Sequence, residues 1–312
     1  MLRGRVGVWL GGYGFPAEED RANARELERW GYAALWFGEA PGGKESFTRA
    51  ATLLAATDSI VIATGIASIW GRDPLNTSSA IRTIGEAFPG RFIAGLGVSH
   101  PPAVEMRGFD YRSPLATTRD YLAAMAAVTH ASPAPADEPS IVLAALRPRM
   151  LELARDAADG AHPYFVPVEH TRRAREILGD GKLLAPELAV VLEPDAGKAR
   201  RLARQHTGSF YLSAPNYVRN LEWLGFFPAD LEGDGSDALV DAVVAWGDEA
   251  AIVARIEEHL AAGADHVCLQ PVTTVRPLTD GPDHAALDVL RQLAPALREA
   301  GLLGAWHPRE HA

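Results

Sequence analysis

Apolar residues along this chain follow two alternating patterns. Short runs such as 60–67 and 92–98 are apolar at nearly every position, which is typical of strands buried on both faces of a parallel sheet. Between the runs, apolar residues recur every three or four positions, the spacing that places them on one face of a helix. The pattern predicts eight strands, at roughly residues 5–11, 33–39, 60–68, 91–98, 140–146, 161–166, 185–193 and 265–271.

One junction recurs between these elements: a helical pattern ends near a glycine, and a strand begins soon after it. Gly31, Gly90, Gly160 and Gly263 occupy this position. Glycine there supplies the left-handed turn that a short connection from helix to strand requires. The recurrence indicates one repeated α/β architecture across residues 1–312. Eight β/α units in about 250 residues predict a (β/α)8 TIM barrel, with a doubly wound open sheet as the alternative.

Two helix signals are more local. Asp73 followed by Pro74 predicts a helix start, with a capping carboxylate and a proline in the first helical position. Near the end of the chain, leucines at 287, 290, 293 and 297 keep a helical spacing, and Pro295 is expected to bend that helix.

Residues 206–240 follow the seventh expected strand and do not resemble an ordinary barrel helix. They hold six aromatic residues between prolines and glycines: Phe210, Tyr211, Tyr217, Trp223, Phe226 and Phe227. Insertions in barrels tend to lie in the loops above the active face. We expect a lid that shapes an apolar substrate pocket; a dimer contact or local packing is an equal alternative.

Composition and charge narrow the class of protein. The chain has 312 residues, is 47% hydrophobic, carries a formal net charge of −10 and contains one cysteine, Cys268. A net negative charge argues against a nucleic-acid partner, and no apolar run approaches the ~20 residues of a membrane span. Because the start of the chain lacks the pattern of a signal peptide and a disulfide framework is absent, we expect a cytoplasmic protein.

Several kinds of reaction chemistry find no support in the sequence. No spacing of histidines or carboxylates predicts a metal site, and His307 and His311, four residues apart, lie in a terminal tail. No Gly-x-Ser-x-Gly nucleophile turn is present. By contrast, the third and fourth expected strands end in residues with little side chain, which leaves room for a flat ligand. Such a chain suits an enzyme in which an organic cofactor carries the reaction.

Four motifs resemble those of the luciferase-like monooxygenase superfamily, and within it the actinobacterial branch of deazaflavin (coenzyme F420)-dependent oxidoreductases. They are residues 35–39, 63–66, 90–97 and 161–166. The resemblance implies a barrel that binds F420 in its carboxyl-terminal mouth, transfers hydride to or from a small organic substrate, and forms a homodimer. The alternatives are an FMN-dependent monooxygenase on the same fold and a non-catalytic flavin-binding protein.

The resemblance also implies which residues meet the cofactor. A non-prolyl cis peptide is expected at Gly65–Ile66, against the tricyclic ring. Gly95 and Gly97 would let the ring and its side chain approach the fourth strand, although tight barrel packing would also explain both glycines. The phosphate would lie at the turn after the sixth strand and the helix that follows. Arg172, Arg173 and Arg175 come close behind this turn, and they could either bind the phosphate or be solvated surface charges. The implied cofactor-binding residues are Gly65, Ile66, Gly95, Gly97, Val98, Ser99, Tyr164, Phe165 and Val166.

Glu39 and His100 are the candidate catalytic residues. The family carries an acidic residue at the end of the second strand, usually aspartate followed by histidine, where this chain has Glu39-Ala40. Glu39 could relay a proton, or it could pair with a rim arginine such as Arg72. His100 could exchange protons near neutral pH, or begin a rigid loop. Trp70, Tyr211 and Phe226 are expected to wall the substrate pocket, and the anionic tail of F420 would favour basic residues, with Arg72, Arg172 and Arg276 as candidates.

Overall fold

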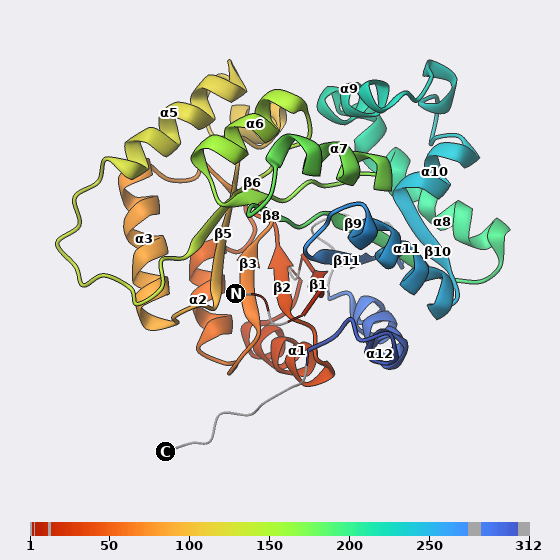
Figure 1. Ribbon diagram of the computed structural model, residues 1–312, viewed down its shortest axis with the longest axis horizontal. Coiled ribbons are helices and arrows are strands. Elements are labelled where there is room, and N and C mark those ends of the chain that lie inside the picture. The colour runs from red at the N-terminus through yellow and green to blue at the C-terminus, as the bar shows by residue number, and fades with distance from the viewer. Residues whose placement is uncertain (1, 3, 12–13, 274–281, 305–312) are drawn as a thin grey trace.

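A curled parallel sheet surrounded by helices forms the core of the computed structural model (Figure 1), which describes residues 2, 4–11, 14–273 and 282–304. Its strands are β1 (Val6–Trp9), β2 (Ala34–Phe37), β3 (Val61–Thr64), β4 (Ala67–Ser68), β5 (Phe92–Gly97), β6 (Ser140–Leu143), β7 (Gly160–Ala161), β8 (Leu183–Leu184), β9 (Glu187–Leu192), β10 (Val244–Gly247) and β11 (Val267–Pro271). Hydrogen-bonded neighbours follow the order β10-β9-β11-β1-β2-β3-β5-β6-β7-β8, and β4 pairs with β5.

The sheet closes on itself through residues 183–192. β8 pairs with β7, and β9, only two residues further along the chain, pairs with β11 on the other side. The Ala185 N–H donates to the Ala161 carbonyl at 3.0 Å, while the Cys268 N–H donates to the Pro186 carbonyl at 2.9 Å. One chain segment therefore joins both ends of the sheet, and the expected (β/α)8 barrel is confirmed.

The helices form the outer layer of the barrel and a separate group beyond β9. They are α1 (Ala17–Trp30), α2 (Ser46–Leu54), α3 (Pro74–Ala87), α4 (Pro101–Glu105), α5 (Pro114–Ala126), α6 (Pro148–Ala157), α7 (Val168–Leu178), α8 (Ala196–Ser209), η1 (Tyr211–Ser213), α9 (Pro215–Leu224), η2 (Pro228–Asp230), α10 (Asp237–Val243), α11 (Glu249–Ala261) and α12 (His284–Glu299). Asp73 caps α3 by accepting from the Asn76 N–H, as expected. α12 continues past Pro295 without interruption. None of the helices in the described ranges is both long and apolar enough to span a membrane.

Some strand boundaries differ from the prediction. The third expected strand is interrupted between β3 and β4, and of the expected 161–166 only the first residue belongs to a strand. β10 was not predicted, because its apolar residues continue the pattern of α10 without a break in the sequence. It pairs with β9 outside the closed ring, where the end of β9 leaves the barrel.

Three of the four junction glycines have the expected left-handed backbone: Gly31 (φ 93°), Gly90 (φ 69°) and Gly263 (φ 106°). The expectation for Gly160 was wrong, because this residue lies within β7. A Cβ at Gly160 would lie 2.0 Å from the Leu183 carbonyl oxygen. Close approach of the neighbouring strand, not the conformation of a turn, therefore requires glycine there.

The buried side chains form three clusters. The largest lies between the strands and the outer helices, and a small one inside the barrel contains Trp36 and Cys268. The third joins Ala189 and Val191 of β9 to the insertion, through Tyr217 and Leu221 of α9 and Val240 of α10. The aromatic segment after the seventh strand is thus anchored on β9, next to the end of β7.

Candidate functional site

The carboxyl ends of parallel barrel strands meet at one rim, the face on which barrel enzymes place their active sites. Most of the residues expected to bind the cofactor or to take part in the reaction lie on this rim. Glu39 follows β2, Trp70 follows β4, His100 follows β5, and Tyr164 and Phe165 follow the short strand β7. The insertion supplies Tyr211 from η1.

Glu39 is held in a dense polar network. Both of its carboxylate oxygens accept from Arg72, at 3.0 and 3.1 Å. The Ser68 N–H and the Ser46 hydroxyl donate to Oε2 at 3.0 and 3.2 Å, and Arg107 approaches Oε1 at 3.7 Å. The ion pair with Arg72, the alternative that the sequence left open, is thus present. It fixes the side chain at the rim, 7% exposed.

The peptide bond between Gly65 and Ile66 is cis, as the resemblance implied. The indole N–H of Trp9 donates to the Gly65 carbonyl at 2.8 Å. A Cβ at Gly65 would lie 2.7 Å from His162 Nε2 and 3.0 Å from Trp9 Nε1. Residues inside the barrel therefore leave no space for a side chain at this position.

Gly95 and Gly97 each have a packing reason. A Cβ at Gly95 would lie 1.9 Å from the Thr64 carbonyl oxygen, and one at Gly97 would lie 2.8 Å from two carbons of the Ile66 side chain. Contacts of β5 with the end of β3 and with Ile66, between β3 and β4, therefore account for both glycines without a ligand. Their role against a cofactor ring remains a prediction.

The rim beyond β5 carries an apolar wall. Trp70 donates its indole N–H to the Val98 carbonyl at 3.0 Å, and its ring lies 5.3 Å from that of Phe109. Ser99 has a left-handed backbone, with φ 59°. Phe109 and Met106, which the sequence analysis did not select, are 47% and 74% exposed. The expected wall at Trp70 thus extends over the segment after α4.

His100 lies between the barrel rim and the insertion. Its ring is 5.0 Å from that of Phe210 and 5.7 Å from that of Tyr217. Burial lowers the pKa of His100, and a hydrogen bond with Asn216 opposes that shift. The side chain is therefore neutral near pH 7 and can donate or accept a hydrogen bond.

The turn after β7 packs directly against the insertion. The Phe165 ring stacks on that of Tyr211, with centroids 4.3 Å apart and planes 12° from parallel. The Tyr211 hydroxyl donates to that of Tyr164 at 3.1 Å, and Tyr164 donates to Gln270. Phe226, in contrast, packs against the cluster beneath the insertion.

The helix after this turn, α7, begins without a side-chain cap at Pro167. The arginines on it are engaged elsewhere. Arg172 and Arg173 pair with Glu169, and Arg175 binds Asp265 and three backbone carbonyls. Arg72 is likewise bound by carboxylates, so of the three arginines proposed for an anionic tail, Arg72 and Arg172 are already paired. Arg276 lies outside the described residues.

His307 and His311 lie outside the described residues, and within those that are described no group of three histidine, cysteine, aspartate or glutamate side chains is placed to hold a metal ion.

Glu187 is a buried polar residue that the sequence analysis missed. It begins β9 and is only 1% exposed. Its Oε2 accepts the Phe165 N–H at 3.0 Å, and burial raises its pKa to about 8 against the opposing effect of that bond. The sequence feature that could have identified Glu187 is an acidic residue within an otherwise apolar strand. Such a residue is informative because charged side chains are seldom fully buried.

The sequence analysis also did not identify His162 as a residue inside the barrel, although His162 belongs to the motif at residues 161–166. Its ring stacks on Trp36 at 4.5 Å. Nδ1 lies 2.7 Å from the Ala185 carbonyl; because a carbonyl only accepts, Nδ1 carries the proton. Burial lowers the pKa of His162 to about 4, so the ring is neutral beneath Gly65.

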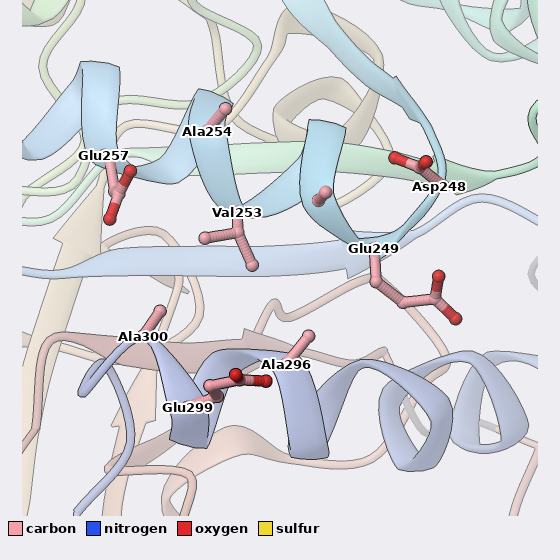
Figure 2. Close-up of a pocket in the computed structure, with 9 residues that line it drawn as sticks. Asp248, Glu249, Val253, Ala254, Glu257, Ala296, Glu299 and Ala300 are labelled. Carbon is pink, nitrogen blue, oxygen red and sulfur yellow. The ribbon is translucent and has the colours of Figure 1, made fainter.

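A separate groove of about 480 Å³ lies on the outer layer, between α11 and α12. Figure 2 shows residues that line it, among them alanines and Val253 together with the acidic side chains of Asp248, Glu249, Glu257 and Glu299. None of the expected site residues lines it, so it is distinct from the barrel rim.

Comparison with known proteins gives both sequence relatives and structural neighbours. The 5,10-methylenetetrahydromethanopterin reductase of Methanolobus tindarius is 24% identical over 284 residues, covering 78% of this chain and 87% of the relative. The coenzyme F420-dependent tetrahydromethanopterin reductase of Methanopyrus kandleri superposes with a TM-score of 0.72 at 18% identity, covering 94% of this chain and 99% of that one.

An FMN complex has the same fold. The oxygenating constituent of 3,6-diketocamphane monooxygenase from Pseudomonas putida superposes with a TM-score of 0.68 at 16% identity, covering 94% of this chain and 96% of that one. At these identities, structural likeness shows the fold alone. The family model for luciferase-like monooxygenases, however, matches residues 1–266. The chain therefore belongs to the luciferase-like monooxygenase family.

Proposed function

We propose that this protein is an oxidoreductase that moves a hydride between coenzyme F420 and a small organic substrate at the barrel rim. The observation that carries the proposal is the meeting of the barrel rim and the insertion around His100. Phe210 and Tyr217 of the insertion meet the end of β5 there, and the turn after β7 packs on the same insertion through Tyr211. The Methanopyrus structure, of an F420-dependent reductase, supports the choice of cofactor.

The residues present fit a flat ring with an anionic tail. Aromatic side chains line the rim from Trp70 to Phe210. No side-chain cap at Pro167 covers the start of α7, where the His170 N–H donates to the Pro167 carbonyl and the N–H groups of Val168 and Glu169 precede it. A helix amino terminus of this kind stabilises an anion through its free N–H groups and its dipole. Tyr164, Phe165 and Val166 would hold the phosphate end, while Ile66, Val98 and Ser99 would face the ring. When bound, F420 supplies a carbon centre that gives or accepts hydride.

The two candidate catalytic residues take different roles in this proposal. Neutral His100 exchanges a proton with the substrate oxygen, from a position between the apolar walls. Glu39 does not touch the reacting groups in this proposal. Its hydrogen bonds hold the Ser68 backbone and Arg72, and so fix the end of β4, where the ring would be supported. Tyr211 and Trp70 exclude water from the reacting groups. The same proposal includes a homodimer and a cytoplasmic location.

FMN-dependent monooxygenation is the second candidate function, favoured by the fold shared with the FMN complex. Titration of the purified protein with F420 and with FMN, followed by cofactor fluorescence, separates the two. We expect F420 to bind at least tenfold more tightly, a difference of ~1.4 kcal/mol. Preference for FMN would favour oxygen chemistry. Binding of F420 without turnover of any donor or acceptor would indicate a non-catalytic binding protein.

A phosphate-free deazaflavin analogue tests the contact with α7. If the amino terminus of that helix binds the phosphate, the analogue should bind at least tenfold more weakly than F420. Arg291→Gln provides a control, because this exposed arginine is paired with Asp288 on α12 and should not affect the affinity. Equal binding of the two cofactors would overturn this placement of the phosphate.

A further inference from the structure

Glu187 is a buried carboxyl group that the proposed reaction does not use. It lies at the start of β9 and is 1% exposed. Its Oε2 accepts the N–H of Phe165 at 3.0 Å, whereas Oε1 has no hydrogen-bond partner among the described residues. Ionising a buried carboxyl group whose second oxygen has no hydrogen-bond partner costs free energy. The burial of Glu187 therefore points to a specific function for this side chain.

The bond from Glu187 reaches a residue with an unusual backbone. Phe165 has a φ of 57°, which non-glycine residues adopt only when their surroundings hold them there. The Phe165 ring is stacked on Tyr211 of η1 at 4.3 Å, and Tyr211 meets Tyr217 of α9 edge-on at 5.1 Å. The carboxyl group thus connects to the insertion through one backbone N–H and one aromatic stack.

Among the residues that the structure describes, the groups around Glu187 offer no positive charge. Tyr164 from the end of β7, Tyr211 from η1, Tyr217 from α9 and Cys268 from β11 all have a pKa raised by burial and by Glu187 itself. His162, 3.9 Å from the Cys268 sulfur, and His206 of α8, beside Tyr211, each have a pKa lowered to about 4. All of these groups are neutral near pH 7, so an ionised Glu187 would lack a compensating cation among them.

We propose that neutral Glu187 is the positioning residue that holds the insertion over the barrel rim, and that ionisation of Glu187 loosens the insertion. Burial raises the pKa of this carboxyl group to about 8, so the neutral form predominates at pH 6.5 and the ionised form at pH 9. An unpaired charge beneath Phe165 and the tyrosines favours any opening that admits water to it. The loosening would be a property of the protein without cofactor. An effect on F420 binding rests on the proposed function, in which the turn at Tyr164–Val166 holds the phosphate end of the cofactor.

Hydrogen–deuterium exchange on the full chain tests the proposal. Protection of the peptides covering residues 210–224 is measured at pH 6.5 and pH 9 and corrected for intrinsic exchange. In the unsubstituted protein we expect protection to fall roughly 30-fold by pH 9, because opening returns Glu187 to its ordinary lower pKa and the loss accumulates from pH 6.5 up to the raised pKa of about 8. Peptides from α12 serve as an internal reference and should keep their protection.

Glu187→Gln isolates the charge. Glutamine keeps an oxygen to accept the Phe165 N–H and is neutral at both pH values, so its protection should be the same at both. Glu193→Gln, one residue beyond the end of β9, should behave like the unsubstituted protein. Tyr211→Leu removes the aromatic stack and should give low protection at both pH values.

Two results would overturn the proposal: equal protection of residues 210–224 at the two pH values in the unsubstituted protein, or the same loss at pH 9 in Glu187→Gln. Both concern the protein without cofactor, so they are independent of whether F420 binds. An F420 titration at the two pH values then tests the consequence. We expect weaker binding at pH 9 in the unsubstituted protein and no change in Glu187→Gln.

Discussion

Arg72 binds Glu39 through two hydrogen bonds, from Nη2 to Oε1 at 3.0 Å and from Nη1 to Oε2 at 3.1 Å. The side chains are 13% and 7% exposed, and Arg72 also contacts Glu45 and lies over the Phe47 ring. Removing one partner leaves a poorly solvated charge, which typically costs 3–5 kcal/mol in a buried pair. The pair therefore fixes the rim between β2 and β4.

We expect Arg72→Gln to lower the free energy of unfolding by about 3 kcal/mol, because Glu39 loses both guanidinium bonds. Glu39→Gln should cost less, since its side-chain oxygen can still accept from Ser68. Urea denaturation measures both. Arg172→Gln, in an exposed pair with Glu169, should change stability by less than ~1 kcal/mol. A similar small change for Arg72→Gln would mean that the rim pair is not structural.

Gly95→Ala and Gly97→Ala should both destabilise the barrel, but only one of them should be rescued. The added Cβ at Gly97 meets the side chain of Ile66, whereas that at Gly95 meets the carbonyl of Thr64. Overpacking of this kind typically costs ~1–3 kcal/mol. Ile66→Ala should therefore restore most of the stability lost in Gly97→Ala and none of that lost in Gly95→Ala.

Thermal and urea unfolding of the double and single variants measure this difference. Gly197→Ala, in the first turn of α8, is a matched control whose Cβ approaches only side-chain atoms, Asp195 Oδ1 at 3.3 Å and Arg201 Nη1 at 3.5 Å. If Ile66→Ala rescues both glycine variants equally, the assignment of the backbone contact at Gly95 is wrong.

Trp9→Phe should weaken the support of Gly65. The substitution keeps a ring against Tyr164 but leaves the Gly65 carbonyl without the indole donor at 2.8 Å. We expect a loss of about 1–3 kcal/mol in unfolding free energy. Trp246 lies on β10, outside the closed ring, and Trp246→Phe removes its indole bond to Asp241 of α10. This variant serves as the control for tryptophan loss. In the cofactor titration, only Trp9→Phe should lower the affinity.

Stability should decrease on both sides of a maximum near pH 6.5. Burial lowers the pKa of six of the described histidines, one of which is His100. In the other five it falls to about 4 or, for His259, about 3: His162, His170, His206, His259 and His266. Their contribution is present above the unfolded value of about 6.5 and is lost as pH falls through the lowered values. Glu187, with its pKa raised to about 8, contributes stability below its unfolded value that is lost as pH rises through 8.

Urea unfolding between pH 4 and pH 9 measures both slopes. Glu187→Gln should remove the decline between pH 6.5 and 8 and leave the acid limb unchanged. An acid limb that begins well below pH 5 would show that the histidines are not held neutral by the fold.

His100→Gln should reduce turnover more than binding. Glutamine keeps a hydrogen-bonding group between Phe210 and Tyr217 but cannot exchange a proton near pH 7. Loss of a general acid or base typically lowers kcat by 10²–10⁴. Steady-state kinetics should show this fall in kcat, and the F420 dissociation constant should stay within a few fold. A proportional loss of F420 binding would instead indicate that His100 acts only by packing between the barrel rim and the insertion.

Local signals in the sequence gave much of the fold correctly. The apolar runs located all eight strands of the ring, because burial on both faces leaves a mark in the sequence itself. Asp73 and Pro74 marked the start of α3, since a cap acts within one turn. The family motifs placed the cis peptide at Gly65–Ile66. In contrast, β10 was missed because its residues continue a helical pattern, and Gly160 was misread because its crowding comes from Leu183.

The site was predictable only in part. Positions such as Glu39 and His100 follow from where strands end, and the structure places both at the rim. Their partners did not follow, because Arg72 lies 33 positions from Glu39 in the sequence, and the packing of Phe210 on His100 depends on how the insertion folds back.

By itself, then, the sequence determined the repeating β/α pattern, the order of the strands and the residues that reach the rim, since each depends on neighbours within a few positions. Only the tertiary structure decided which charges are paired, which glycines are crowded and which acid is buried. Glu187 and Phe165 show the reason: they lie 22 positions apart, and closure of the barrel brings them within hydrogen-bonding distance.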